Sequence, residues 1–129
     1  MTWTLLNSKA YQKLSFSSAK ALPYFLGKVK VPYGDGQKFK TEFTFSYPEA
    51  QKLGFSYATF SKAIKEVISH GFIDPVERGG LKGYRQGYNR FRLSRRWEKF
   101  GTPVFEWIDW ETFTGELETG EVTKESEVT

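Results

Sequence analysis

The side chains of this chain that could do chemistry are mainly cations and small polar groups between residues 56 and 92. Apolar residues in the first part of this stretch recur at helical spacing and leave hydroxyls and lysines on the opposite side. The second part is rich in glycine and carries arginines and lysines. Such groups donate hydrogen bonds and neutralise anions, so the chemistry they offer is the binding of phosphates and other acceptors.

Groups suited to catalysis are sparse. The chain has a single histidine, His70, and no cysteine. A Cys–His metal site or a set of nucleophile, base and orienting residue cannot be assembled from these side chains. His70 precedes Gly71 at the predicted end of a helix, where an imidazole satisfies the last carbonyl groups. We therefore expect no catalytic residue, no metal, no cofactor and no enzymatic activity.

Two helices joined by a tight turn are predicted to position the first polar group. The first helix opens at residues 47–49 with Pro48 at its first position, and it stops at Gly54, which can adopt a left-handed conformation. Ser56 caps the second helix, and small Ala50 lets the two helices cross closely. The expected buried face of the second helix consists of Phe60, Ile64, Val67 and Ile68. This spacing predicts a helix-turn-helix.

A β-hairpin is predicted next, from strands at residues 72–77 and 88–93. In the returning strand, apolar Phe91 and Leu93 alternate with arginines, so one face is apolar and the other cationic. A third strand over residues 39–45 would pair with the hairpin. The cations of the predicted hairpin are Arg78, Lys82, Arg85, Arg90 and Arg92.

Further helices are predicted before and after these elements. Caps at Asn7-Ser8 and at residues 15–17 predict helices over residues 9–14 and onward to Leu26. Pro23 should kink the second of these or mark its first turn. Ser94 is expected to cap a short helix over residues 94–100.

The order of these elements resembles that of winged helix-turn-helix DNA-binding domains, over roughly residues 15–94, with Ala50, Gly54 and Phe60 at the required spacing. The resemblance implies an α+β fold: a three-helix bundle, a small antiparallel sheet and a basic β-hairpin wing, here with a C-terminal extension. In such domains the second helix enters the major groove, and the wing follows the backbone or the minor groove. The pattern is similar to transcription regulators and to small phage or plasmid replication-protein domains.

If the apolar face of the second helix is buried, the outward side carries Ala58, Thr59, Lys62, Lys65, Glu66 and Ser69. We expect direct or water-mediated base contacts from Ser56, Tyr57 and Thr59, and contact of Ala58 with a thymine methyl group. Lys62 and Lys65 suit phosphates, although both could form an ordinary solvated face, and Tyr57 could simply pack. The hairpin cations should share this exposed flank, and Arg95 and Arg96 could extend it.

Charge divides the chain into a basic body and an acidic end. The net charge is +4. Residues 1–104 carry 18 of the 19 Lys and Arg residues with seven acids, a net +11, whereas the remainder has a net −7. A body this basic suits a polyanion, although solvated charge is the simpler alternative. We expect a winged-helix domain over residues 1–104, an aromatic-acidic extension over 105–114 and an acidic, flexible tail over 115–129.

The expected function is binding of double-stranded DNA, in a transcription regulator or a phage or plasmid replication protein. The early turns of the second helix lack Arg, Asn and Gln, the side chains that read bases in pairs of hydrogen bonds. The alternative is therefore a winged helix that binds protein and no nucleic acid. A homodimer and a replication or transcription partner protein remain open. No apolar run reaches the ~20 residues of a membrane span, and the bacterial cytoplasm or nucleoid is the expected location.

Overall fold

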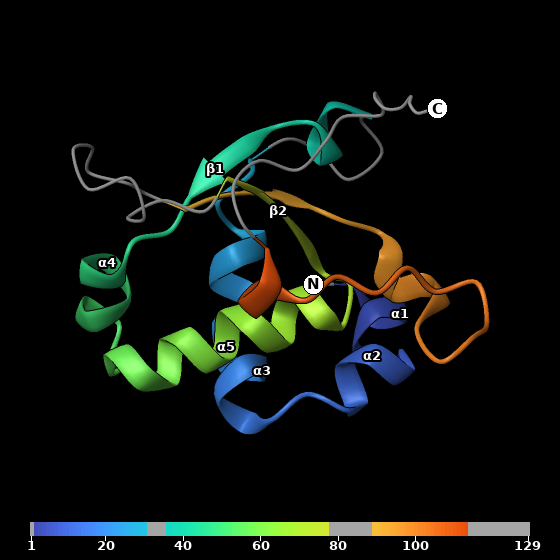
Figure 1. The fold of residues 1–129 in the computed structure, drawn as a ribbon, viewed down its shortest axis with the longest axis horizontal. Helices are drawn as coiled ribbons and strands as arrows, with labels where there is room; N and C mark the ends of the chain where they lie inside the picture. Colours follow the sequence, from blue (N-terminus) through green and yellow to red (C-terminus); the bar gives the residue numbers. More distant parts are fainter. Residues whose placement is uncertain (1, 31–35, 78–88, 114–129) are drawn as a thin grey trace.

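The computed structural model describes residues 2–30, 36–77 and 89–113. In this part of the chain the fold is α+β, with five α-helices and one three-stranded antiparallel sheet (Figure 1). The helices are α1 Trp3–Leu6, α2 Lys9–Gln12, α3 Phe16–Leu26, α4 Tyr47–Lys52 and α5 Tyr57–Ser69. The strands are β1 Glu42–Thr44, β2 Ile73–Glu77 and β3 Arg90–Leu93, and 3₁₀ turns form η1 Gly36–Phe39, η2 Arg96–Lys99 and η3 Trp110–Thr112. None of the described helices is long and apolar enough to cross a bilayer.

All five described helices have a residue with a hydroxyl side chain at the N-cap. The N-caps are Thr2, Ser8, Ser15, Ser46 and Ser56, each accepting a hydrogen bond from a backbone N–H in the first turn. Ser46 and Glu49 of α4 form a reciprocal capping box. Pro48 is therefore the second residue of α4, one place later than predicted, where its missing N–H still costs no helical bond.

The turn between α4 and α5 has the predicted conformation. Gly54 has a φ of +97°, and the N–H of Phe55 donates to the Ala50 carbonyl at 3.0 Å. A left-handed glycine followed by this bond closes the end of α4 and reverses the chain sharply. The predicted pair of helices, the cap at Ser56 and the end of α5 at His70 are confirmed.

The sheet has the strand order β1-β3-β2, so the predicted hairpin pairing and the third strand are confirmed. Phe43 of β1 and Pro75 of β2 both lie opposite Phe91 of β3. The strand predicted over residues 39–45 is shorter than expected. Thr41 donates its N–H and its hydroxyl to the Gln37 carbonyl, which closes a turn there and leaves the first residues in η1.

An aromatic cluster fills the space between the sheet and the helices. Phe25 of α3 lies at its centre, with ring centroids of four phenylalanines 4.9 to 6.4 Å away: Phe43, Phe45, Phe60 and Phe91. All five side chains are buried. Helices α3 and α5 therefore cover the same face of the sheet (Figure 1). Aromatic packing of this kind adds to the burial of apolar area and fixes the orientation of α5.

The ends of the described chain hold features that the sequence did not predict. Helix α1 precedes the predicted helix at residues 9–14. Pro23 lies inside α3, which excludes the second of its two predicted roles, that of marking the first turn. The helix predicted at residues 94–100 is the 3₁₀ turn η2. Ser94 Oγ accepts the N–H of Arg96, the first residue of η2, at 3.1 Å, so Ser94 bonds the start of this turn. In the extension, Trp110 of η3 is buried with its ring 5.8 Å from that of Phe91.

Candidate nucleic-acid interface

Helix α5 exposes one polar face along its length. Phe60, Ile64, Val67 and Ile68 are fully buried, as predicted. On the opposite side Ala58, Lys62 and Lys65 are exposed, and Ser61 lies partly exposed at the edge. A helix with one buried and one polar face is a rigid support for side chains that bind a partner. We refer to Ala58, Lys62 and Lys65 as the α5 outer face.

Ser56 and Thr59 at the start of α5 are already bonded to each other. The Thr59 N–H donates to Ser56 Oγ at 3.2 Å, and the Ser56 hydroxyl donates to Thr59 Oγ1 at 2.9 Å. Ser56 is exposed and Thr59 is half-buried. Both hydroxyl groups can still accept a bond, but a base contact would compete with the cap that holds the helix start.

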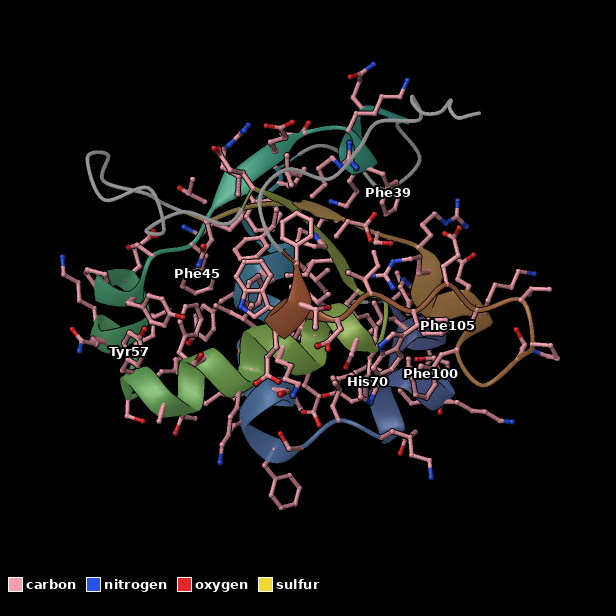
Figure 2. The ribbon with its side chains drawn as sticks, viewed as in Figure 1. Phe39, Phe45, Tyr57, His70, Phe100 and Phe105 are labelled. Carbon is pink, nitrogen blue, oxygen red and sulfur yellow. The ribbon has the colours of Figure 1, made fainter. Side chains whose placement is uncertain are left out.

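For Tyr57 the sequence leaves two roles open, packing against the fold and contact with a base, and its side chain is both packed and exposed. Its ring stacks on Tyr47 of α4, with centroids 4.3 Å apart and planes 18° apart. Even so, 63% of the residue is exposed. It lies at one end of α5, while His70 and Phe100 lie at the other (Figure 2). Tyr57 thus tethers α4 to α5 and presents the rest of its surface beside the α5 outer face.

Of the residues predicted on the outward side, Ser69 is buried, contrary to the prediction, and Glu66 is half-buried and bonded to α3. Glu66 Oε1 accepts the N–H of Ser15 at 3.0 Å and its hydroxyl at 2.8 Å, and Ser69 is buried. Partial burial raises the pKa of Glu66, but hydrogen bonds from Ser18 and Ser15 outweigh it and hold the pKa below its usual value. Glu66 therefore caps α3 from α5. The sequence signal was the first turn of α3, which lacks an acid to help Ser15.

The two lysines of the α5 outer face differ in their partners. Lys65 Nζ lies 2.9 Å from Glu111 Oε1, and this hydrogen bond raises the pKa of Lys65. Lys62 is exposed and forms no ion pair with any residue that the structure describes. Lys62 is therefore accessible to a partner, whereas Lys65 shares its charge with the C-terminal extension.

The hairpin arginines that the structure describes do not share the flank of α5. Phe91 faces the helices, so the alternation of β3 places Arg90 and Arg92 on the other face of the sheet. Arg90 pairs with Glu42, and its Nε lies 2.8 Å from Glu77 Oε1. The expected common surface is wrong for these two residues. The other predicted contacts, Arg78, Lys82 and Arg85, lie outside the described residues.

Arg96 is a structural residue and not part of a cationic stripe. Its Nε lies 2.6 Å from Asp74 Oδ1, and Nη2 donates at 2.9 Å to both the Ile68 and the Ile73 carbonyls. Nη1 donates to the Glu106 carbonyl at 2.8 Å. The side chain is only 9% exposed. It joins the end of α5, strand β2 and the extension, so it offers no charge to a partner.

His70 ends α5, as predicted. Its Nδ1 lies 2.9 Å from the Glu66 carbonyl oxygen, and its ring stacks on Phe100 with centroids 4.7 Å apart. Within the described ranges, no group of three or more His, Asp or Glu side chains could hold a metal ion. What the described site offers is therefore positive charge and hydroxyl groups on a rigid helix.

Comparisons with known proteins add no family to this description. No protein-family model, no curated protein and no solved structure matches the chain.

Proposed function

We propose that this protein is a winged-helix protein that binds double-stranded DNA through the α5 outer face. The support from the fold is the order of its elements: α3, β1, α4, α5 and then the strands β2 and β3, with β3 in the middle of the sheet. This is the order of a helix-turn-helix that continues into a β-hairpin. The support from the site is the rigid, exposed and cationic face of α5.

The single observation that carries the proposal is the placement of Lys62. It lies on the side of α5 opposite the buried Phe60 and Ile64, is exposed, and pairs with no described carboxylate. A helix fits the width of the major groove, where cations beside the base edges neutralise phosphates. In this arrangement Ala58 is small enough to let the first turn of α5 approach the bases closely.

The composition of the α5 outer face predicts how the binding would behave. Lysines neutralise phosphates as point charges, and the outer face lacks the Arg, Asn or Gln that reads a base with two hydrogen bonds. Most of the binding free energy should then come from release of counterions. We expect affinity that falls steeply with salt, and modest discrimination among sequences unless residues outside the described ranges contribute.

The proposal can be tested by titrating the protein into a labelled random-sequence duplex at about 50 mM salt and measuring the fluorescence anisotropy of the duplex. Wild type should bind. Ala58→Glu places a carboxylate on the α5 outer face and should weaken binding by about ten-fold, because it repels the phosphates and fills the space beside the bases. Thr4→Glu adds the same charge to the first turn of α1 and serves as the matched control, with at most a two-fold effect expected from net charge alone.

Two biological roles fit a protein of this kind, a transcription regulator and a phage or plasmid replication protein. A regulator would protect its own promoter in a footprint on the flanking genome. A replication protein would protect repeated sites at an origin. A regulator that binds two half-sites also requires a homodimer, so the oligomeric state measured on DNA separates the roles further.

A protein-binding winged helix is the second candidate, and large exposed apolar side chains favour it. Phe16, Trp3 and Trp107 are 95%, 78% and 65% exposed. Aromatic side chains are enriched where proteins meet. Failure of the wild-type protein to bind any duplex at low salt would exclude the DNA proposal and leave this one.

A further inference from the structure

The C-terminal extension is anchored in the core beside helix α5. Trp110 of η3 is 2% exposed and packs on Phe91, and Phe113 stacks on Trp110 with centroids 5.9 Å apart. Figure 1 shows η3 next to α5, and the two elements are in contact. A buried tryptophan holds the neighbouring residues in a defined position. The place of Glu111, the next residue along the chain, is thus fixed by packing.

This anchoring brings a carboxylate to a lysine of the proposed DNA surface. Glu111 Oε1 lies 2.9 Å from Lys65 Nζ, and the Glu111 N–H is held by Asp109 Oδ1 at 3.2 Å. Both side chains remain open to water, with 45% of Lys65 and 65% of Glu111 exposed. An ion pair this exposed is weak and exchanges its partners readily.

We infer that Glu111 is a built-in competitor of the DNA phosphates for Lys65, an autoinhibitory contact that lowers the affinity of the α5 outer face. This inference rests on the proposed function. The carboxylate occupies the position at Lys65 that a phosphate oxygen would take in the complex. DNA must then displace Glu111 to reach this lysine, whereas Lys62 is available at once.

The ion pair between Lys65 and Glu111 also predicts how the gain in DNA affinity depends on salt when Lys65 is freed. A lysine that meets a phosphate instead of a carboxylate adds a counterion release of about 0.9 to the slope of log affinity against log salt. Freeing Lys65 should therefore raise affinity most at low salt. The gain should shrink as salt screens the exposed charges, because the Debye length falls to about 3 Å at 1 M.

The test compares Glu111→Gln with Glu98→Gln in anisotropy titrations of the full chain on a random duplex. Each variant removes one carboxylate and frees one cation, since Glu98 pairs with Arg95 at 2.8 Å on η2. Glu111→Gln should tighten binding by about two- to five-fold at low salt, the range for an exposed pair. Glu98→Gln should show only the small gain due to net charge. In a Lys65→Gln background, Glu111→Gln should give no more than Glu98→Gln.

Three outcomes overturn the inference, and they separate it from the proposed function. Equal affinities of Glu111→Gln and Glu98→Gln, in a wild-type protein that binds DNA, remove the inference alone. A full gain from Glu111→Gln in the Lys65→Gln background shows general repulsion and removes it as well. No duplex binding by the wild type or by either variant removes both the inference and the DNA proposal.

Discussion

The lysines of α5 and the arginines within and after the hairpin carry the same charge, but they differ in exposure and in partners. Lys62 extends into solvent without a partner among the described residues. Arg96 is nearly buried and bonds to Asp74 and to three backbone carbonyls. Arg90 lies between these extremes, on a sheet face where Glu42 and Glu77 neutralise it.

Whether a cation is available to a partner depends on the acceptors around it. Glu66, the one acid of α5, bonds to Ser15 at the start of α3, and Glu111 of the extension pairs with Lys65, so Lys62 keeps no partner among the described residues. Strands β1 and β2 instead place acids beside Arg90: Glu77 lies across from it on β2, and Glu42 of β1 forms a second ion pair with it. Opposite charges on neighbouring strands stabilise a sheet, and here they remove Arg90 from the surface offered to an anion.

Replacement of the buried Arg96 should destabilise the fold far more than replacement of the exposed Lys62. Arg96→Met should lower the free energy of unfolding by about 3 kcal/mol, because it leaves Asp74 without its cation and takes one donor from each of three carbonyls. Lys62→Met should change it by no more than about 0.5 kcal/mol, as is usual for an exposed helix position. Urea unfolding followed by circular dichroism measures both, and similar losses in the two variants would contradict the distinction.

The bonds between Glu66 and Ser15 predict a smaller loss of stability. Glu66→Ala should lower the free energy of unfolding by about 1 kcal/mol at pH 7, because the start of α3 loses the acceptor for the Ser15 N–H and hydroxyl. The folded pKa of Glu66 is below its usual value of 4.5. This stabilisation is therefore complete above the unfolded pKa and is lost as the pH falls through the folded one.

Urea unfolding of Glu66→Ala at pH 7 and at pH 3 gives the comparison directly. The variant should differ from wild type clearly at pH 7 and much less at pH 3. Glu106→Ala, which removes an exposed carboxylate, is the control. A deficit of the same size at both pH values would show that the Glu66 charge does not hold α3.

Local signals in the sequence predicted the elements around the candidate site well. Ser56 and Gly54 gave the start of α5 and the turn before it, because caps and left-handed glycines act over a few residues. The period of Phe60 and Ile64 gave the buried face of α5. The alternating pattern also predicted that a third strand pairs with the hairpin, but not which hairpin strand it joins; it pairs with β3, where Phe43 lies opposite Phe91.

Long-range partners could not be predicted, and they decided which charges belong to the site. Glu66 and Ser15, whose N–H it accepts, are 51 residues apart in the sequence, and Lys65 and Glu111 are 46 residues apart. Arg96 meets carbonyl groups of three segments, and a carbonyl carries no signal in the sequence. The sequence does not indicate where the extension packs, because neither Trp107 nor Trp110 carries a signal of whether it enters the core.

The proposal that the α5 outer face binds DNA can be tested by the salt dependence of DNA binding in Lys62→Gln. Anisotropy titrations between about 50 and 200 mM salt would give the slope of log affinity against log salt for wild type, Lys62→Gln and Lys99→Gln. Lys99 is an exposed lysine on η2 and controls for the loss of one charge. We predict that Lys62→Gln weakens binding and reduces the slope by about 0.9, one phosphate contact, while Lys99→Gln keeps the wild-type slope. Equal slopes for the two variants would contradict an interface on α5.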